Sequence, residues 1–276
     1  MDSIDVLRIL GYIALLRALE HSLHLTGQFG QDSSRPFGWL LFVVTLVAAM
    51  AFCSGINVAI EYVAYRRLRT APRLAPLITA VGMSFILQFV GLKWYGSLQK
   101  SWPSVLPDKQ WDLAGVTIHI RFLIVLGVTI PLLLLMSWIV THTKQGKAMR
   151  ATAQDQDAAR LMGIDVNRTI SFTFALGGAL AGAAGIMYQQ TIGTTWFALG
   201  FQLGLIAFTA AVLGGIGNLA GAVVGGVLIG LIQGINDGAP YGFGQQWSQS
   251  VVFSILILLL VFRPEGLLRG STGEHA

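Results

Sequence analysis

Few residues of this chain are of types and spacings that could do acid–base or metal chemistry. His21 and His24 lie three apart beside Glu20, but a metal site needs further ligands within reach. Asp155 and Asp157 lie two apart, so on a helix they point to different faces and cannot act together as general acid and general base. The sequence therefore predicts no catalytic constellation, no metal site and no cofactor.

Glu61 is the remaining carboxylate in a special position, because it stands at the end of a long apolar stretch. It could serve as a gate or a proton relay, or it could pair with Tyr65 or Arg66 within about one helical turn. The arginines that follow favour the second interpretation, an interfacial carboxylate. The other apolar stretches contain no acidic residue, which argues against a proton-driven carrier.

The elements that carry these residues follow from the composition. The 276 residues are 54% hydrophobic and only 11% charged, too little charge to hydrate the surface of a soluble domain. Six or seven apolar segments approach the length of about 20 residues that crosses a bilayer as a helix. They cover residues 37–63, 74–95, 118–140, 169–189, 201–214, 219–235 and 248–262. The expected fold is all-α, a polytopic transmembrane helix bundle.

The distribution of basic residues predicts how the bundle is oriented. If the stretch 65–73 is cytoplasmic and the spans alternate, most Lys and Arg fall on the inside, as the positive-inside rule requires. The C-terminus and residues 141–168 are then cytoplasmic, while 96–117 and 190–200 lie outside. The net charge of +5 therefore reflects membrane topology and contact with lipid rather than nucleic-acid binding. The single Cys53 lies inside a predicted span, so it indicates no disulfide framework.

Three regions follow from this pattern. Residues 1–36 form an N-terminal segment with several charges, for which we favour an interfacial or frayed helix over a full span. Residues 37–269 form the transmembrane domain, and residues 270–276 form a cytoplasmic tail.

The polar segment 144–168 lies between two predicted spans and has the pattern of a helix with its own start and stop. Alanines recur along it, and Asp157 can pair with Arg160 three residues later. Helix ends are indicated by Gly146 for the preceding span, Gly163 as a C′ cap, and Asp165 or Asn167 as the next N-cap. We therefore expect a short cytoplasmic helix over 147–162 that serves as a docking site.

Glycines spaced by four residues recur in the later spans and would form flat strips where another helix can approach closely. The strips that we assign to packing within the bundle contain Gly178, Gly182, Gly217, Gly221 and Gly225. The alternative is that these strips border a translocation pathway. Between residues 203 and 235 the glycines predict two short helices joined by a tight turn, or one broken helix.

Three amide side chains in the predicted spans are candidates to line a pathway, namely Asn57, Gln88 and Gln202. Amides are costly to bury in lipid, so they either face a wet cavity or bond to neighbouring helices.

Five stretches of the chain carry a family resemblance. They are EYVAYRRLRTAPRLAPLITAVGMSFILQ from Glu61, GKAMRATAQDQDAARLMGIDVNR from Gly146, ALGGALAGAAGIMY from Ala175, AVLGGIGNLAGAVVGGVLIGLIQ from Ala211 and FRPEGLL from Phe262. In this order they resemble the permease subunits of branched-chain amino acid ABC importers, of the LivH type. The resemblance covers roughly residues 37–269. Members of this family usually begin with an additional span and an INFAHG-like motif. Neither is found here, so we expect a shortened chain, a misassigned start or an altered first segment.

The resemblance implies a subunit of the bacterial inner membrane that works with a second, LivM-like permease, two cytoplasmic ATPase subunits and a periplasmic solute-binding protein. ATP hydrolysis would occur on the separate ATPase subunits, so this chain would not itself be an enzyme. The helix at 147–162 would be the coupling helix that sits in a groove of the ATPase. The residues expected to couple are Arg150, Ala151, Asp155, Ala158, Ala159 and Gly163.

Other functions remain open at this point. The same kind of permease could carry urea, short amides or other amino acids, because selectivity is expected largely from the binding protein. A stand-alone channel or secondary carrier would leave the cytoplasmic helix without a purpose. An integral-membrane enzyme would need ionisable residues clustered at one membrane face, a pattern that the sequence does not show.

Overall fold

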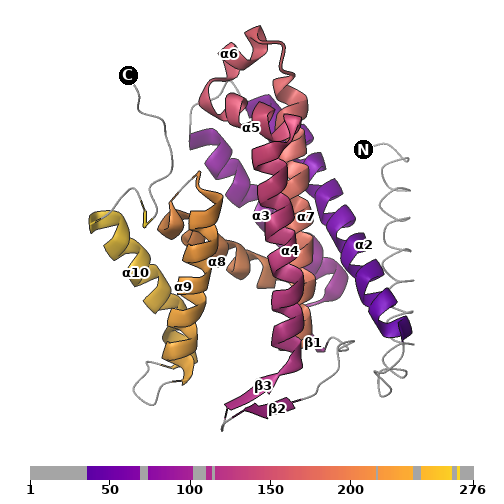
Figure 1. Ribbon diagram of the computed structural model, residues 1–276, viewed down its shortest axis with the longest axis vertical. Helices are drawn as coiled ribbons and strands as arrows, with labels where there is room; N and C mark the ends of the chain where they lie inside the picture. Colours follow the sequence, from indigo (N-terminus) through magenta and orange to yellow (C-terminus); the bar gives the residue numbers. More distant parts are fainter. Residues whose placement is uncertain are drawn as a thin grey trace. The chain divides into compact units, whose positions relative to one another are not determined.

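A computed structural model of the chain describes residues 36–68, 74–101, 110–113, 116–215, 217–238, 244–262 and 266–267 (Figure 1). The N-terminal residues Glu20, His21 and His24 and the tail 270–276 lie outside the described residues, as does most of the basic stretch after Leu68. The chain divides into two compact units, Met1–Trp196 and Phe197–Ala276, and each is considered by itself.

Helices account for nearly all of the described chain, as the composition predicts. The first unit contains α2 (Pro36–Ile60), α3 (Leu74–Tyr95), α4 (Ile120–His142), α5 (Lys144–Gln154), α6 (Gln156–Leu161) and α7 (Val166–Ile192). The second contains α8 (Leu199–Gly214), α9 (Leu219–Gly238) and α10 (Ser248–Phe262). Short turns of other helix types are η1 (Glu61–Tyr65, a π-helix), η2 (Arg66–Leu68) and η3 (Gln245–Trp247). The predicted all-α fold class is confirmed, and the predicted span limits agree to within a few residues.

Several of these helices have the length and composition of membrane spans. Within the described residues, four apolar stretches are long enough to cross a bilayer: Phe42–Leu68, Ile120–His142, Val166–Ile192 and Leu219–Gly238. Three shorter apolar helical stretches are Ile78–Trp94, Leu199–Gly214 and Ser248–Leu259. Large apolar side chains such as Phe89 and Leu134 are two-thirds exposed, so lipid or other subunits must cover them. The chain is a multi-pass membrane protein.

The first unit is built around the contact between α2 and α7. Phe42 and Leu46 of α2 pack with Ala183 and Met187 of α7, and side chains of α4 complete this core. Gly178 and Gly182 of α7 face the α2 backbone, and a Cβ at Gly182 would lie 2.5 Å from the carbonyl oxygen of Ala49. The close approach that these two glycines permit is the packing role predicted from their spacing.

Short strands join the loops at one end of this unit. β1 (Lys100–Ser101) pairs antiparallel with β4 (Thr194–Thr195), and β2 (Gln110–Leu113) pairs antiparallel with β3 (Val116–His119). β3 runs into α4 and β4 follows α7, so both pairs lie at the opposite end of these helices from α5 and α6 (Figure 1). The two predicted outer loops of this unit therefore meet through their described residues at β1 and β4, although the sequence did not predict the strands.

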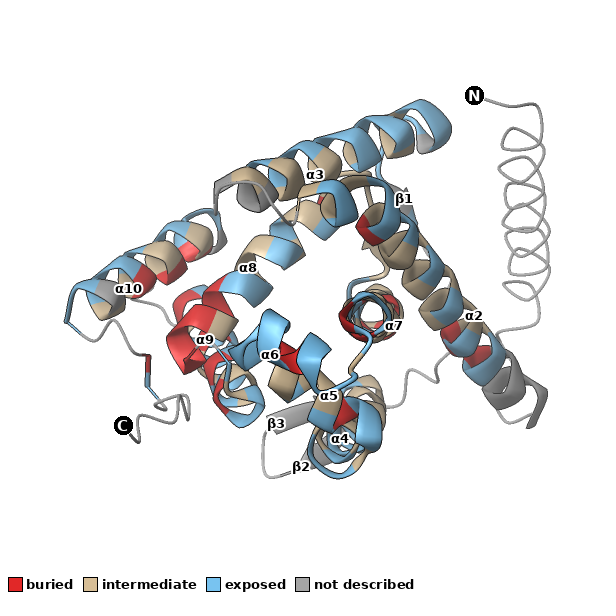
Figure 2. Cartoon of the chain, turned by 90° about the horizontal axis from the view of Figure 1, so that it is seen from above, coloured by how far each residue is buried: buried red, intermediate tan, exposed pale blue. Residues whose placement is uncertain are grey.

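The second unit is a helical hairpin of α8 and α9 with α10 packed against it. A Cβ at Gly214 would lie 1.9 Å from the carbonyl oxygen of Gly221, and one at Gly225 would lie 2.1 Å from that of Ala210. Ala210, Ile229 and Val252 form the buried core, and Figure 2 shows buried residues gathered on α8 and α9. Of the two predicted alternatives for this region, the structure has two helices joined by a tight turn.

Gly217 differs from the other predicted packing glycines. It lies in the connection between α8 and α9 with φ of +91°, and no heavy atom lies within 4 Å of where its Cβ would be. Its role is to turn the chain through a left-handed conformation, which glycine adopts without steric cost. The four-residue spacing cannot distinguish such a turn from a helical strip.

The C-terminal segment returns to this turn. The Leu267 amide donates to the carbonyl oxygen of Leu213 over 2.9 Å, and Gly266 approaches the backbone of Gly215. The end of the described chain and the α8–α9 turn therefore lie at the same end of the second unit.

Candidate docking site

The polar segment forms two helices, α5 and α6, which project beyond the end of α4 (Figure 1). α4 ends at His142, and Thr143 caps α5 by accepting a hydrogen bond from the Gly146 amide at 3.0 Å. A Cβ at Gly146 would lie 2.2 Å from the Val140 carbonyl oxygen, so glycine permits the tight turn. The predicted break at Gly146 is thus displaced to Thr143, and Gly146 belongs to α5.

Arg150 holds α5 back against the end of α4. Its guanidinium donates to the carbonyl oxygens of Val140 and Thr141, which lie in the last turn of α4 and have no partner within that helix. A cation at this position also interacts favourably with the negative end of the α4 dipole. Arg150 therefore fixes the angle between α4 and α5.

The helix predicted over 147–162 is interrupted at Asp155. This residue has extended backbone angles of φ −150° and ψ 117°, and its Oδ1 accepts from the amides of Asp157 (2.8 Å) and Ala158 (3.1 Å). Asp155 is thus the N-cap of α6, so the prediction of a single helix was wrong. The signal was present locally, since an aspartate can stop one helix and start another by binding free amides.

The segment ends as its residue types predict. Gly163 has φ of +81°, and the Ile164 amide donates to the Ala159 carbonyl oxygen over 3.0 Å, which is the pattern of a Schellman cap. Asp165, rather than Asn167, then caps α7 by accepting from two backbone amides. The predicted pair of Asp157 and Arg160 is present at 3.1 Å.

The α5–α6 segment (Lys144–Leu161) and the turn after it present an apolar tip to solvent. Leu161 is 89% exposed and Met162 is 83% exposed, and Figure 2 shows that most of α6 is exposed. A polar segment outside the membrane gains nothing by exposing two large apolar side chains unless a partner covers them. Sequence reasoning missed both residues, although two apolar residues directly before a capping glycine at the end of a polar helix were a usable signal.

The structure divides the six predicted coupling residues by role. Ala159 is only 3% exposed and packs within the chain, so its side chain is not available to a partner. Arg150, Asp155 and Gly163 set the path of the backbone through the contacts above. Ala151 is half-buried and Ala158 is exposed. Contact of these residues with another subunit stays a prediction.

Replacing Asp155 by alanine is expected to fray α6, because two of its first amides lose their acceptor, at a cost of about 1 kcal/mol in local stability. Asp155→Asn is the matched control, since asparagine caps about as well as aspartate. Hydrogen exchange at the amides of residues 156–161 measures the effect. Equal exchange in the two variants would show that the cap does not hold α6.

Comparison with known proteins identifies this architecture. The family described as branched-chain amino acid transport system / permease component matches residues 9–261. The chain belongs to this family. The permease is 36% identical to the high-affinity branched-chain amino acid transport system permease protein BraD of Pseudomonas aeruginosa, over 96% of this chain and 83% of that protein.

Two further relatives are similar to the permease over smaller shares of its length. The permease protein LivH of Escherichia coli (strain K12), also of a high-affinity branched-chain amino acid transport system, is 36% identical over 84% of this chain and 75% of its own length. The autoinducer 2 import system permease protein LsrC of Enterobacter sp. (strain 638) is 32% identical over 69% of this chain and 53% of its own length. No solved structure matches the permease.

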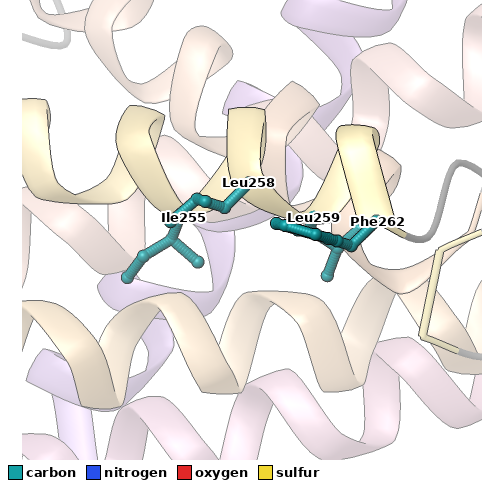
Figure 3. Close-up of a pocket in the computed structure, with 4 residues that line it drawn as sticks. All are labelled: Ile255, Leu258, Leu259 and Phe262. Atoms are coloured by element: carbon teal, nitrogen blue, oxygen red, sulfur yellow. The ribbon is translucent and has the colours of Figure 1, made fainter.

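The described part of the permease has hollows, and two of them are defined by the residues that line them. One, of about 360 Å³, lies between α5 and α7, where Thr152 is 7% exposed and its Oγ1 has no hydrogen-bond partner among the described residues. The other, of about 320 Å³, lies along one side of α10 and is lined by Ile255, Leu258, Leu259 and Phe262, which project from the same face (Figure 3). These four side chains offer no donor or acceptor, so they cannot orient a polar solute.

The three predicted pathway residues have different surroundings in the permease. Asn57 of α2 donates from Nδ2 to the Phe174 carbonyl oxygen of α7 over 2.9 Å, so it joins two helices. The Nε2 atom of Gln88 is buried without a partner among the described residues, and Gln202 is exposed. Neither of the two hollows is lined by any of them. A role in the pathway stays a prediction for all three.

The surroundings of Glu61 differ from those expected from the sequence. Its side chain is fully buried (0% exposed) in the π-helical turn at the end of α2, and its Oε2 accepts a hydrogen bond from the Ser171 hydroxyl of α7 at 2.6 Å. Ser171 is thus a partner of Glu61 that the sequence did not predict, and Arg66 lies over the ring of Tyr62 at 5.2 Å. The permease does contain a buried carboxylate, so the argument against proton coupling from the lack of one no longer holds.

Proposed function

We propose that this permease is the membrane subunit of an ATP-driven importer for branched-chain amino acids in the bacterial inner membrane. The observation that carries the proposal is the α5–α6 segment with its exposed Leu161 and Met162, in a chain of the branched-chain amino acid permease family. An importer that concentrates its solute needs an external source of energy, and this segment would be the place where that source acts.

The segment suits the transmission of force. Thr143, Gly146 and Arg150 fix it to α4, and the capped turn at Gly163 leads into α7 within a few residues. A partner that moves the apolar tip would therefore move α4 and α7 with it, because short, hydrogen-bonded connections do not absorb the displacement.

Three kinds of partner follow from this proposal. A second permease subunit would complete the pathway, two cytoplasmic ATPase subunits would bind the α5–α6 segments, and a periplasmic binding protein would deliver the solute. The C-terminus would be cytoplasmic, on the same side as α5–α6. The positive-inside count of the sequence supports this orientation.

A different solute is the second candidate, because the permease also resembles LsrC, named for autoinducer 2 import. The greater identity to BraD and LivH, over more of both chains, favours branched-chain amino acids. Urea, short amides and other amino acids are further alternative solutes, and the transport mechanism would be the same for each of them.

Leucine-loaded binding protein is expected to stimulate ATP hydrolysis of the assembled transporter at least about fivefold, since it shifts the equilibrium between the states of the permease. The permease would be reconstituted in liposomes with the permease, ATPase and binding protein encoded beside it. Binding protein without solute and binding protein offered urea or another amino acid are the controls. An assembled complex that responds to one of these other solutes, and not to leucine, would show that the solute is wrong.

A further inference from the structure

A buried hydrogen bond links the two helices that lie at the centre of the first unit. Ser171 of α7 donates to Glu61, which is fully buried where α2 changes to a π-helical turn. A carboxylate is costly to remove from water, so a chain that buries one must satisfy it with donors. No solute can reach Glu61 in this conformation, so the residue acts through its protein contacts.

Two further contacts join the same parts of α2 and α7. Asn57 donates to the Phe174 carbonyl oxygen at 2.9 Å, and the ring of Tyr65 lies 5.3 Å from the ring of Phe174. Farther along the two helices, a Cβ at Gly178 of α7 would lie 2.6 Å from the Cys53 carbonyl oxygen of α2. The end of α2 is therefore attached to the first turns of α7 by side-chain contacts, and farther along by direct backbone packing.

The first turns of α7 also border the α5–α6 segment. Phe174 and Thr173 of α7 line the same hollow as Arg150 and Thr152 of α5. α7 itself begins at Val166, directly after the turn that ends α6. The contacts of Glu61 thus lie between the α5–α6 segment and the body of α2.

We propose that the Ser171–Glu61 hydrogen bond makes the end of α2 and the π-helical turn after it follow the first turns of α7 when an ATPase subunit moves the α5–α6 segment. Glu61 and Ser171 are positioning residues, and neither needs to touch the solute. The inference rests on the proposed function only in taking α5–α6 as the ATPase docking segment. It assigns the buried carboxylate to the mechanical link between docking and translocation.

Val63 lies two residues after Glu61 and is 66% exposed, so a Val63→Cys substitution can report the movement of the end of α2 once Cys53, the single cysteine of the chain, is replaced by serine. The measurement is the rate at which a maleimide labels this position in the complex with cysteine-free partner subunits, before and after trapping with ATP and vanadate. With Ser171 intact, trapping is expected to change this rate at least about fivefold. No solute is added, so the result does not depend on which solute the transporter carries.

Valine and threonine have nearly the same shape, so substituting each of them for Ser171 tests the effect of the hydroxyl group alone. Ser171→Val is expected to abolish the change in labelling rate on trapping, whereas Ser171→Thr, which keeps the hydroxyl, is expected to retain it. Thr191→Val is the control on the same helix, since within the described part of the chain the Thr191 hydroxyl donates to the Met187 carbonyl oxygen of its own helix. Glu61→Gln retains an acceptor oxygen and is expected to retain the change, which tests the proposal even if Ser171→Val does not fold.

The outcomes separate this inference from the proposed function. If trapping leaves the labelling rate at position 63 unchanged while Ser171 is intact, or if folded Ser171→Val responds as the permease with Ser171 does, the end of α2 does not follow α7 through this bond. Loss of the response in folded Glu61→Gln would also overturn the inference, because the charge rather than the hydrogen bond would then matter. Failure of the ATPase to bind, or of leucine to stimulate it, would instead refute the proposed function.

Discussion

Gly182→Ala is expected to separate α2 from α7 and to lower the free energy of unfolding by about 2–3 kcal/mol, because its Cβ would overlap backbone atoms that cannot move aside. The nearest are the Ala49 carbonyl oxygen at 2.5 Å and the Ala49 carbonyl carbon at 2.8 Å. A flexible side chain could yield to a methyl group, but a helical carbonyl can yield only if the whole helix shifts. The core of Phe42, Leu46 and Met187 would lose contact with that shift.

Gly185→Ala is the matched control, because Gly185 lies on the same helix and has nothing within 4 Å of its Cβ position. Alanine has the higher helix propensity, so stability should be unchanged or slightly raised. Thermal unfolding in detergent, followed by the fraction that remains monodisperse, compares the two variants. If Gly182→Ala were as stable as Gly185→Ala, the described approach of α2 and α7 would be incorrect.

Truncation of the apolar tip is expected to release the ATPase subunit. The double variant Leu161→Ala, Met162→Ala should weaken the binding of the ATPase by about 100-fold, since buried apolar anchors at an interface commonly contribute about 1–2 kcal/mol each or more. Both side chains are more than four-fifths exposed in the chain alone. Their loss should therefore leave the fold of the permease unchanged while uptake falls with the loss of binding.

Leu98→Ala controls for the removal of an exposed leucine. Leu98 is 80% exposed and directly precedes β1, which pairs with β4 beyond the end of α7. The apolar tip lies before the start of α7, so Leu98 is at the opposite end of this helix. Co-purification of the ATPase subunit and titration of its binding would compare the variants. Unchanged ATPase binding in the double variant, with the fold intact, would contradict docking through this tip.

The limits of the spans were predictable because they depend on local properties. Apolar runs of sufficient length end where charge or glycine begins, whatever the rest of the chain does. Caps are equally local: Gly163 and Asp165 act on amides and carbonyls within a few residues of themselves. The break at Asp155 belongs to the same class and could have been predicted from its residue type.

Contacts between distant residues could not be predicted in this way. Glu61 and Ser171 are 110 positions apart, so the pairing that buries the carboxylate has no trace in the spacing around either residue. A helical pattern around Glu61 points to Tyr65 and Arg66, which are neighbours in any helix. Only the packing of α7 against α2 decides that the side chain faces inward.

The sequence by itself determined that this protein is a polytopic helical membrane protein with a capped polar segment between spans, because hydropathy and helix capping act over one or two helical turns. Tertiary structure alone decided which glycines touch a backbone, why Gly217 turns the chain while Gly182 packs, and which predicted coupling residues are buried. The physical reason is that these properties depend on what lies within 4 Å in space, and helix packing brings together residues that the sequence keeps far apart.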